Sequence, residues 1–267
     1  MDTERLQAFY GQDREYERLQ GGTGQLEFAR TLELMRRHLP PAPATVLDIG
    51  GGTGPYARAL LQGGYRVHYL DAMPNHVERV RADPSLSGLA SVTLGDARAL
   101  PYPDGAADAA LLLGPLYHLT ERADRLAALA EARRALRPGG AVLAAAIPRF
   151  ASTLDGLWTG RDADPAFRLM RDRALATGRH ENPEARPGWF TTAYFHHPDE
   201  LRAELSEAGL REVQVYAVEG VGHLLPDFDA HWNDPERRER LLAMLRVLEQ
   251  EPSLLGASAH LLAVGVR

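Results

Sequence analysis

The stretch Val46–Gly54, VLDIGGGTG, decides the fold of this chain. It starts as a short apolar run and then places four glycines within five positions. Pro55 and a segment with helical periodicity, Tyr56–Leu61, follow at once. Glycine allows a positive φ and lets a ligand approach main-chain N–H groups closely. The stretch therefore predicts a buried strand that leads into a nucleotide-binding turn.

Strand and helix patterns alternate around this turn. The expected strands are Val46–Ile49, Arg66–Leu70, Ser91–Leu94, Ala107–Leu113, Ala141–Ile147, Val213–Val218 and His260–Val266. Helical periodicity is found at Gln25–Leu39, Tyr56–Leu61, Asn75–Arg81, Arg122–Leu136, Pro198–Ala208 and Glu236–Gln250. Such alternation predicts an α/β fold in which a parallel sheet carries helices on both faces. Ligands of such sheets bind beyond the carboxyl ends of the strands, where the strand order reverses.

Three segments fall outside the alternation and predict helical additions. We expect residues 1–44 to form an N-terminal helical lid, and residues 45–148 and 198–267 to form the ligand-binding core. Residues 149–197 are too long for a plain connection, so they are expected to form a cap insertion for substrate. Residues 219–256 are expected to form a second helical insertion within the core.

Composition excludes several classes of protein. The chain has 267 residues and no cysteine, which excludes disulfides and thiolate-rich metal sites. It has no lysine, which excludes enzymes that bind pyridoxal phosphate as a Schiff base. The net charge of −6 disfavours a nucleic-acid partner, which usually requires a basic face. No histidine pair has a metal-ligand spacing such as H-x-x-x-H, so no metal is expected.

The sequence also indicates a location. Met1–Gln20 is charged throughout, and no apolar run approaches the ~18 residues of a membrane-spanning helix. We therefore expect a cytoplasmic protein without a membrane partner. The sequence leaves open whether the protein is a monomer or a homodimer.

The glycine turn on its own is compatible with two kinds of ligand. Gly52-x-Gly54-x-x-Ala57 fits the G-x-G-x-x-G/A fingerprint of dinucleotide-binding Rossmann proteins. Asp71, at the end of the second expected strand, suits dinucleotides and adenosyl compounds alike, because both present ribose hydroxyls. A carboxylate that accepts from both hydroxyls makes two charge-assisted hydrogen bonds. Motifs further along the chain must decide between the two ligands.

Four motifs in order resemble those of class I S-adenosylmethionine-dependent methyltransferases. They are D-x-G-x-G-x-G at Asp48–Gly54, LGDA at Leu94–Ala97, LPYPDGAADAALLLG at Leu100–Gly114 and LRPGG at Leu136–Gly140. The resemblance covers Thr45–Pro148 well and the last two expected strands loosely. It implies a Rossmann-like, seven-stranded methyltransferase sheet with helices on both faces and helical cap insertions. The implied cofactor is S-adenosyl-L-methionine.

The resemblance implies roles for the residues at matching positions. The glycines let the backbone pass the amino-acid end of the cofactor, and the helix from Pro55 lends its first N–H groups. Asp48 is expected to bond the amino-acid portion directly or through water, and Asp71 the ribose. Asp96 and the Ala97 N–H are expected to face adenine. The implied cofactor-binding set is Asp48, Gly50, Gly51, Gly52, Gly54, Asp71, Ala72, Asp96, Ala97, Leu113, Gly114 and Tyr10.

The loop Gly114–Leu119, GPLYHL, follows the fourth expected strand and implies the type of acceptor. Amine-directed nucleic-acid methyltransferases carry Asn/Asp-Pro-Pro-Tyr/Phe here, and Gly114 lacks their first acceptor side chain. The remainder resembles the LHHL of small-molecule enzymes similar to the ubiquinone C-methyltransferase group. His118 is the candidate general base, since a histidine with a pKa near the working pH can accept the acceptor's proton. It can equally fix the geometry of the loop.

Aromatic and basic residues complete the expected site. Tyr117, with a catalytic role, and Tyr10 can face the sulfonium through cation–π contacts, although ordinary packing explains them as well. The residues expected to bind substrate are Arg18, Phe190, Tyr194 and Phe195. The aromatic residues of the cap can alternatively form its own small core.

These observations predict an enzyme that transfers a methyl group from S-adenosylmethionine to an O or N atom of a small molecule by in-line displacement. Two alternatives remain open within the same fold. One is a peptide or protein methyltransferase, which requires an open groove. The other is a non-catalytic protein that binds S-adenosylmethionine. The identity of the substrate, and the choice among O, N and C, are open.

Overall fold

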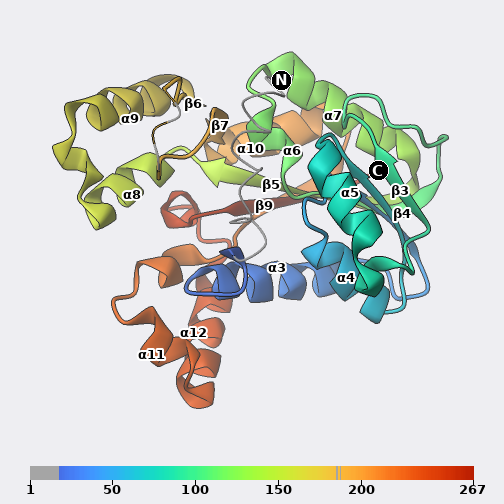
Figure 1. Cartoon of the computed structure of the whole chain (residues 1–267), viewed down its shortest axis with the longest axis horizontal. Coiled ribbons are helices and arrows are strands. Elements are labelled where there is room, and N and C mark those ends of the chain that lie inside the picture. The colour runs from blue at the N-terminus through green and yellow to red at the C-terminus, as the bar shows by residue number, and fades with distance from the viewer. Residues whose placement is uncertain (1–17, 185, 187) are drawn as a thin grey trace.

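A computed structural model describes residues 18–184, 186 and 188–267 (Figure 1). Its central sheet contains β1 (Thr45–Ile49), β2 (Arg66–Asp71), β3 (Ser91–Leu94), β4 (Ala107–Leu112), β5 (Leu136–Pro148), β8 (Arg211–Ala217) and β9 (Leu261–Val266). These strands pair in the order β3-β2-β1-β4-β5-β9-β8. Only β9 runs antiparallel to its neighbours. The predicted α/β sheet is confirmed, and its order reverses between β1 and β4.

Two further strands bring the described sheet to nine rather than the predicted seven. They are β6 (Arg179–His180) and β7 (Ala193–His196), both in the segment expected to be a cap. The end of β5 pairs in parallel with β7, and β7 pairs antiparallel with β6. The long β5 extends past the core and offers a free edge that the returning chain pairs with. With two residues, β6 is too short to show periodicity, and β7 pairs with an extension of β5 that local sequence does not specify.

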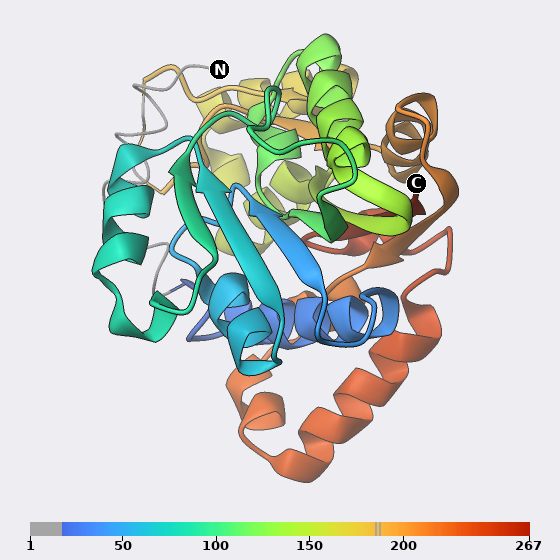
Figure 2. The ribbon, with the colours of Figure 1, turned by 90° about the vertical axis from the view of Figure 1, so that its right-hand side faces the viewer.

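Helices cover both faces of the sheet, as predicted (Figure 2). On one face lie α3 (Gly24–His38), α4 (Pro55–Gln62) and α5 (Pro74–Ala82), and on the other α7 (Arg122–Ala135) and α10 (Pro198–Glu207). Successive residues of β1 serve the two cores, since Val46 packs in one and Leu47 and Ile49 in the other. This is the alternation expected of a strand buried on both sides.

The remaining helices lie mainly in the two segments that were expected to be insertions, of which residues 149–197 are called the cap below. The cap holds α8 (Ala151–Thr159) and α9 (Pro165–Thr177), and the second insertion holds α11 (Phe228–Trp232) and α12 (Pro235–Leu248). Both project from the sheet (Figure 1). A short α6 (Pro115–His118) follows β4, and 3₁₀ turns lie at Pro84–Leu86, Arg161–Ala163, Gly220–Leu224 and Leu255–Ala257.

The second insertion packs against the first described helix rather than standing alone. Leu26 of α3 shares a small core with Phe228, Trp232 and Leu245. The indole of Trp232 donates to the side-chain oxygen of Gln25 at 3.0 Å. Two segments that are far apart in the sequence thus form one unit beside the sheet. Among the described helices, none is both long enough and apolar enough to span a bilayer.

Candidate functional site

The glycine turn has the geometry that the sequence predicts. At Gly50 the backbone takes φ = +71°, and the Gly50 N–H donates to the Leu70 carbonyl at 2.7 Å. A Cβ at this position would lie 2.7 Å from Cγ of Pro115, so a larger residue would collide with the loop after β4. At Gly52 φ is +57°, and a Cβ there would meet no atom within 4 Å. The backbone of the turn is therefore open to a ligand at Gly52.

A pocket opens at the carboxyl ends of β1, β2 and β4, beside the reversal of strand order. Nine residues of the expected cofactor-binding set line it: Asp48, Gly50, Gly51, Gly52, Asp71, Ala72, Ala97, Leu113 and Gly114. The pocket measures about 1170 Å³ with its open mouth included.

Three residues of the expected set are not among the lining residues. Gly54 caps α4 with φ = +80° and packs against Leu86, which gives it a structural role in the turn. The Asp96 carboxylate is held by the guanidinium of Arg98 at 2.6 Å, although its neighbour Ala97 does line the pocket. Tyr10 lies outside the described residues.

Asp71 is held in place at the end of β2 by the turn that it faces. Its Oδ2 accepts from the Gly52 N–H at 2.8 Å, and its Oδ1 accepts from the Met73 N–H at 2.8 Å. The His76 ring nitrogen lies 3.3 Å from the same Oδ1. The carboxylate is thus fixed at the pocket wall, and each oxygen retains lone-pair capacity for a further donor.

Asp48 provides the strongest test of whether the cofactor fits. Its side chain is 1% exposed, and neither carboxylate oxygen has a hydrogen-bond partner among the described residues. Burial, assisted by the negative charge of Asp71, raises the pKa of Asp48 to about 7. Buried polar groups are normally satisfied, so this carboxyl requires a donor or a cation from outside the described chain. The amino group of S-adenosylmethionine supplies both, and the site fits that cofactor.

His118 and Tyr117 lie in the pocket wall beside Gly114. The Tyr117 hydroxyl donates to the Leu113 carbonyl at 3.1 Å, and the His118 ring stacks on Phe190 with centroids 6.2 Å apart. Burial lowers the pKa of His118 to about 4. The expectation of a pKa near the working pH is therefore wrong, and the imidazole is neutral at physiological pH. Its role as a base remains a prediction.

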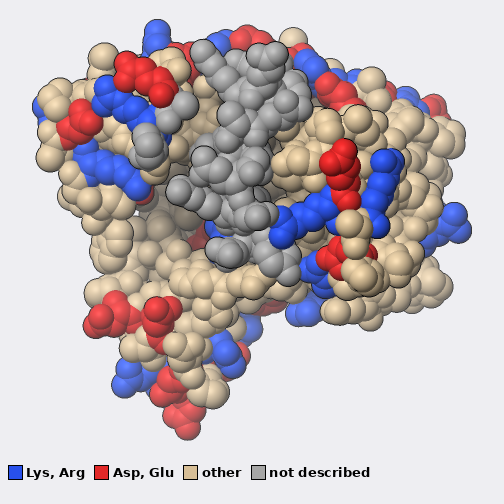
Figure 3. Space-filling model, viewed as in Figure 1, with Lys and Arg blue, Asp and Glu red and all other residues tan. Residues whose placement is uncertain are grey.

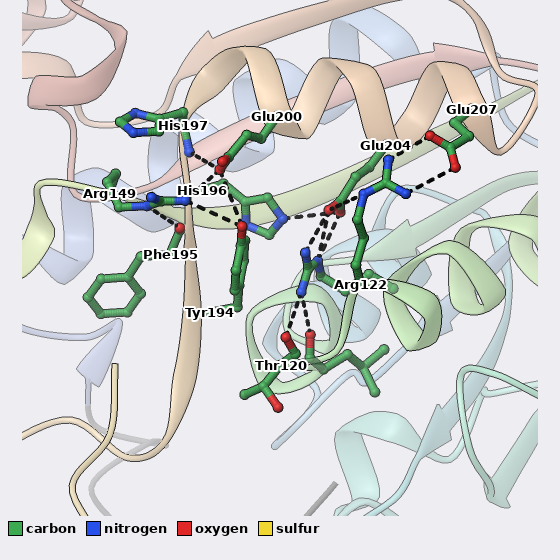
Figure 4. Close-up of polar contacts among 12 residues, drawn as sticks. Thr120, Arg122, Arg149, Tyr194, Phe195, His196, His197, Glu200, Glu204 and Glu207 are labelled. Carbon is green, nitrogen blue, oxygen red and sulfur yellow. Dashed lines mark hydrogen bonds and ion pairs between the residues drawn. The ribbon is translucent and has the colours of Figure 1, made fainter. Parts of the chain in front are cut away.

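Two of the four expected substrate residues, Tyr194 and Phe195 (Figure 4), are not among the residues that line the pocket. The Tyr194 ring lies under the guanidinium of Arg125, whose Cζ is 3.7 Å from the ring centroid. Phe195 is 3% exposed and stacks on His180 at 4.8 Å in the core of the cap. Their aromatic surface is used to attach and fill the cap, so the structure does not support a substrate-binding role for either.

The other two expected substrate residues do lie at the site. Arg18 lines the pocket and pairs with Glu27. Phe190 contacts the rings of Tyr117 and His118. Both assignments remain predictions.

Several pocket residues were missed by sequence reasoning. His76, in the first turn of α5, could have been found, because that turn follows the strand carrying Asp71. Glu27 of α3 and His260 before β9 also line the pocket. Neither residue belongs to a motif, and the two meet only in the folded chain, where His260 Nδ1 lies 3.7 Å from a carboxylate oxygen of Glu27.

Comparisons with known proteins agree with this geometry. A family model described as a methyltransferase domain matches residues 47–144. The ubiquinone/menaquinone biosynthesis C-methyltransferase of Methylobacterium nodulans is 42% identical over 107 residues, 38% of this chain and 41% of that protein. A malonyl-[acyl-carrier protein] O-methyltransferase of Methylococcus capsulatus is 32% identical over 174 residues, 62% of this chain and 59% of that protein. The matched region thus spans less than two thirds of either relative.

A solved structure extends the likeness in fold over most of the chain. The S-adenosylmethionine-dependent methyltransferase of Mesorhizobium loti superposes with a TM-score of 0.58 over 91% of this chain and all of its own, at 19% identity. At that identity the likeness concerns the fold alone.

Proposed function

This chain belongs to the class I S-adenosylmethionine-dependent methyltransferases, and from that premise we propose that it methylates an O or N atom of a small molecule. One observation carries the proposal. The pocket that holds Asp48 and Asp71 continues past Gly114 and His118 to a second region, over the ends of β5, β8 and β9. The same pocket therefore offers a methyl acceptor a place beside the residues that would hold the cofactor.

Each side chain of the pocket has a separate task in this proposal. S-adenosylmethionine supplies a methyl group activated by its sulfonium. Asp48 holds the cofactor's amino group, and Asp71 accepts from its ribose hydroxyls. His118 accepts the proton that a hydroxyl or amine acceptor loses. Alignment of the two reactants accounts for much of the acceleration, because aligned groups gain up to ~7–11 kcal/mol.

A small-molecule acceptor suits this pocket better than a macromolecule. Besides the cofactor residues, the lining includes Tyr56, Val218 and Leu262, which offer apolar surface below the protein exterior. On the face seen in Figure 3, arginines and carboxylates are interspersed without a continuous basic area. The named relatives methylate carbon in one case and oxygen in the other, so carbon remains an alternative acceptor.

An isotope-transfer assay tests the proposal. The protein is incubated with S-adenosylmethionine carrying a labelled methyl group and a panel of small hydroxy, amino and carboxylic compounds, and separately with a set of peptides. We expect S-adenosylhomocysteine to form in step with a methylated product detected by mass. Cofactor binding without turnover on any compound, or label transferred only to peptides, would favour the two alternatives named from the sequence.

His118→Gln is expected to lower kcat by about 10²–10⁴-fold and to leave the cofactor Kd unchanged. Since the pKa of His118 is about 4, the wild-type rate should show no loss from its protonation between pH 9 and pH 6. Steady-state kinetics across this range measure both. His197→Gln is the control, because that ring packs against Phe150 outside the pocket. A His118→Gln rate close to wild type would leave the residue with a scaffolding role.

A further inference from the structure

The far end of the pocket contains a polar cluster that the proposed chemistry does not use. Glu27 of α3 and His260, just before β9, both line the pocket there. Glu219, which follows β8, lies behind His260 and is 2% exposed. Most other lining residues in this region are apolar, among them Val218, Ala145 and Leu262. A polar group in such surroundings normally has a partner.

Contacts with Glu219 fix the orientation of the His260 ring. The Nδ1 of His260 lies 2.6 Å from Oε1 of Glu219. The other oxygen of Glu219 accepts from the Ser258 hydroxyl at 3.0 Å and from the His260 N–H at 2.8 Å. Because Nδ1 is engaged with Glu219, only the second ring nitrogen, Nε2, is available to a ligand. It makes no hydrogen bond to any described residue. The His260 side chain is 23% exposed, at the pocket wall.

The cluster keeps His260 positively charged. Burial by itself lowers the pKa of His260, but the carboxylates of Glu27 and Glu219 outweigh burial and raise it to about 9. Glu27 is in turn paired with Arg18 through both of its oxygens. The charges of the four side chains therefore cancel among themselves. The pocket wall therefore contains a charged imidazole whose orientation is fixed by its contact with a buried carboxylate.

We propose that His260 is a substrate-binding residue whose Nε2–H binds a carboxylate of the methyl acceptor. This inference rests on the proposed function and adds a substrate class to it. A fixed cationic donor with apolar neighbours makes its strongest hydrogen bond to an anionic oxygen. The acceptor is thus a small carboxylic acid with an apolar body, which lies along Val218, Ala145 and Leu262.

Strand spacing separates the anchored carboxylate from the atom that is methylated. The start of β9 lies two strands from the end of β4, with β5 between them. Neighbouring strands are about 4.8 Å apart, so the two ends lie roughly 10 Å apart. An acid anchored at His260 can therefore present a different atom beside Gly114 and His118.

A purely structural role explains the contacts of Glu219, but it does not explain why the imidazole of His260 lies at the pocket wall. The Glu219 carboxylate already joins the ends of β8 and β9 through Ser258 and the His260 main chain. A divalent cation is the competing ligand, since Glu27, Glu219 and His260 offer ligand atoms within 4.8 Å of one another. A cation would have to displace Arg18 from Glu27 and the proton from His260. The carboxylate ligand requires neither displacement.

Matched ligands test the proposal without knowledge of the natural substrate. The full chain, saturated with S-adenosylhomocysteine, is titrated by calorimetry with 3-phenylpropanoate, 3-phenylpropanamide and 3-phenylpropylamine, and with the hexanoate equivalents. We expect an acid to bind at least tenfold more tightly than its amide, and the amines to bind most weakly. His260→Gln should remove the preference and leave the Kd of S-adenosylhomocysteine within twofold. His223→Gln is the control, because that ring bonds the Gly220 carbonyl outside the pocket lining.

A second measurement on the wild-type protein guards against a variant that fails to fold. In protein with ¹⁵N-labelled histidine, the Nε2 resonance of His260 should shift with an acid and not with its amide. The inference is overturned if no acid binds more tightly than its amide, if His260→Gln keeps the preference, or if Mn²⁺ binds at this cluster and the acids do not. Failure of S-adenosylhomocysteine itself to bind would instead overturn the proposed function.

Discussion

Glu204→Ala is expected to lower the free energy of unfolding by about 3–5 kcal/mol, because it leaves a buried arginine without its counter-ion. Arg125 and Glu204 are 1% and 2% exposed. The Arg125 Nη2 and Nε donate to Glu204 at 2.6 and 2.9 Å, and His196 Nε2 lies 3.2 Å away. Despite burial, these contacts hold the pKa of Glu204 at about 2. The carboxylate is therefore ionised whenever the protein is folded at ordinary pH.

Removal of the Glu204 carboxylate should also disturb the loop that carries His118 (Figure 4). The same guanidinium donates through Nη1 to the carbonyls of Leu119 and Thr120, at 3.0 Å each, immediately after His118. Its other contact is the face of Tyr194 in the cap. One buried ion pair thus joins α7, α10, the cap and the loop that carries His118.

Thermal unfolding measures the effect, and the chain provides a matched control. At roughly 2–4 °C per kcal/mol for a chain of this size, the midpoint should fall by roughly 6–20 °C. Glu207→Ala, one turn along the same helix, breaks an ion pair of similar geometry with Arg122, at 2.6 Å, but both side chains are about half exposed. It should cost at most about 1 kcal/mol. Equal losses in the two variants would contradict the buried-pair account.

Asp48→Asn is expected to stabilise the ligand-free protein and to weaken cofactor binding. The pKa of Asp48 in the folded chain is about 7, against 3.8 for an ordinary aspartate. As pH rises from about 4 to 7 the unfolded chain gives up this proton while the folded chain retains it, so stability falls. One pKa unit corresponds to about 1.4 kcal/mol, so at pH 8 the variant should be more stable by up to about 4 kcal/mol.

Cofactor affinity should rise with pH over the range in which the stability of the ligand-free protein falls. The ionised form of Asp48 holds the amino group, so the wild-type Kd for S-adenosylhomocysteine should fall up to about a hundredfold between pH 5 and pH 8. Asp48→Asn should lack this dependence and should bind at least tenfold more weakly at pH 8, through loss of a charge-assisted hydrogen bond.

Unfolding and calorimetric titration across this pH range measure both effects. Asp108→Asn is the control, because that carboxylate already has donors, the Thr45 N–H at 2.7 Å and Arg137 at 2.9 Å. It should destabilise the protein and leave cofactor affinity unchanged. If the difference in stability between the wild-type protein and Asp48→Asn stays the same from pH 4 to pH 8, the raised pKa of Asp48 is contradicted.

Local patterns were sufficient to predict the strands of the core. The expected strand at Ser91–Leu94 coincides with β3, and the expected strand at Val46–Ile49 differs from β1 by one residue. The glycines and prolines between these runs mark the turns, so the bounds follow from local chemistry. For β5 the pattern predicted Ala141–Ile147, whereas the strand begins at Leu136. Leu136 pairs with Ala107 of β4, and the register between the two strands shifts after that pair. The extension of β5 back to Leu136 depends on the neighbouring strand, which local sequence does not specify.

The pocket residues around the glycine turn were predictable from the sequence, and those at the other end of the pocket were not. Asp48 and Asp71 follow from their places at strand ends, and the pocket contains both. Tyr194 was predicted to line the pocket, but its ring packs against Arg125. The sequence does not distinguish these two uses of an aromatic side chain. Glu27 and His260 come from opposite ends of the chain, and only the folded sheet brings them together. The low pKa of His118 depends on burial, which no motif specifies.

A thermal-shift titration with S-adenosylmethionine, S-adenosylhomocysteine and NAD tests the central claim most directly. A ligand at 100 times its Kd adds about 2.7 kcal/mol of stability, which is readily measured. We expect both sulfur compounds to stabilise the protein and NAD to have no effect. In Asp71→Ala the affinity for both should fall at least tenfold, a loss of about 1.4 kcal/mol or more. Stabilisation by NAD alone would contradict the assignment of the glycine turn and every role derived from it.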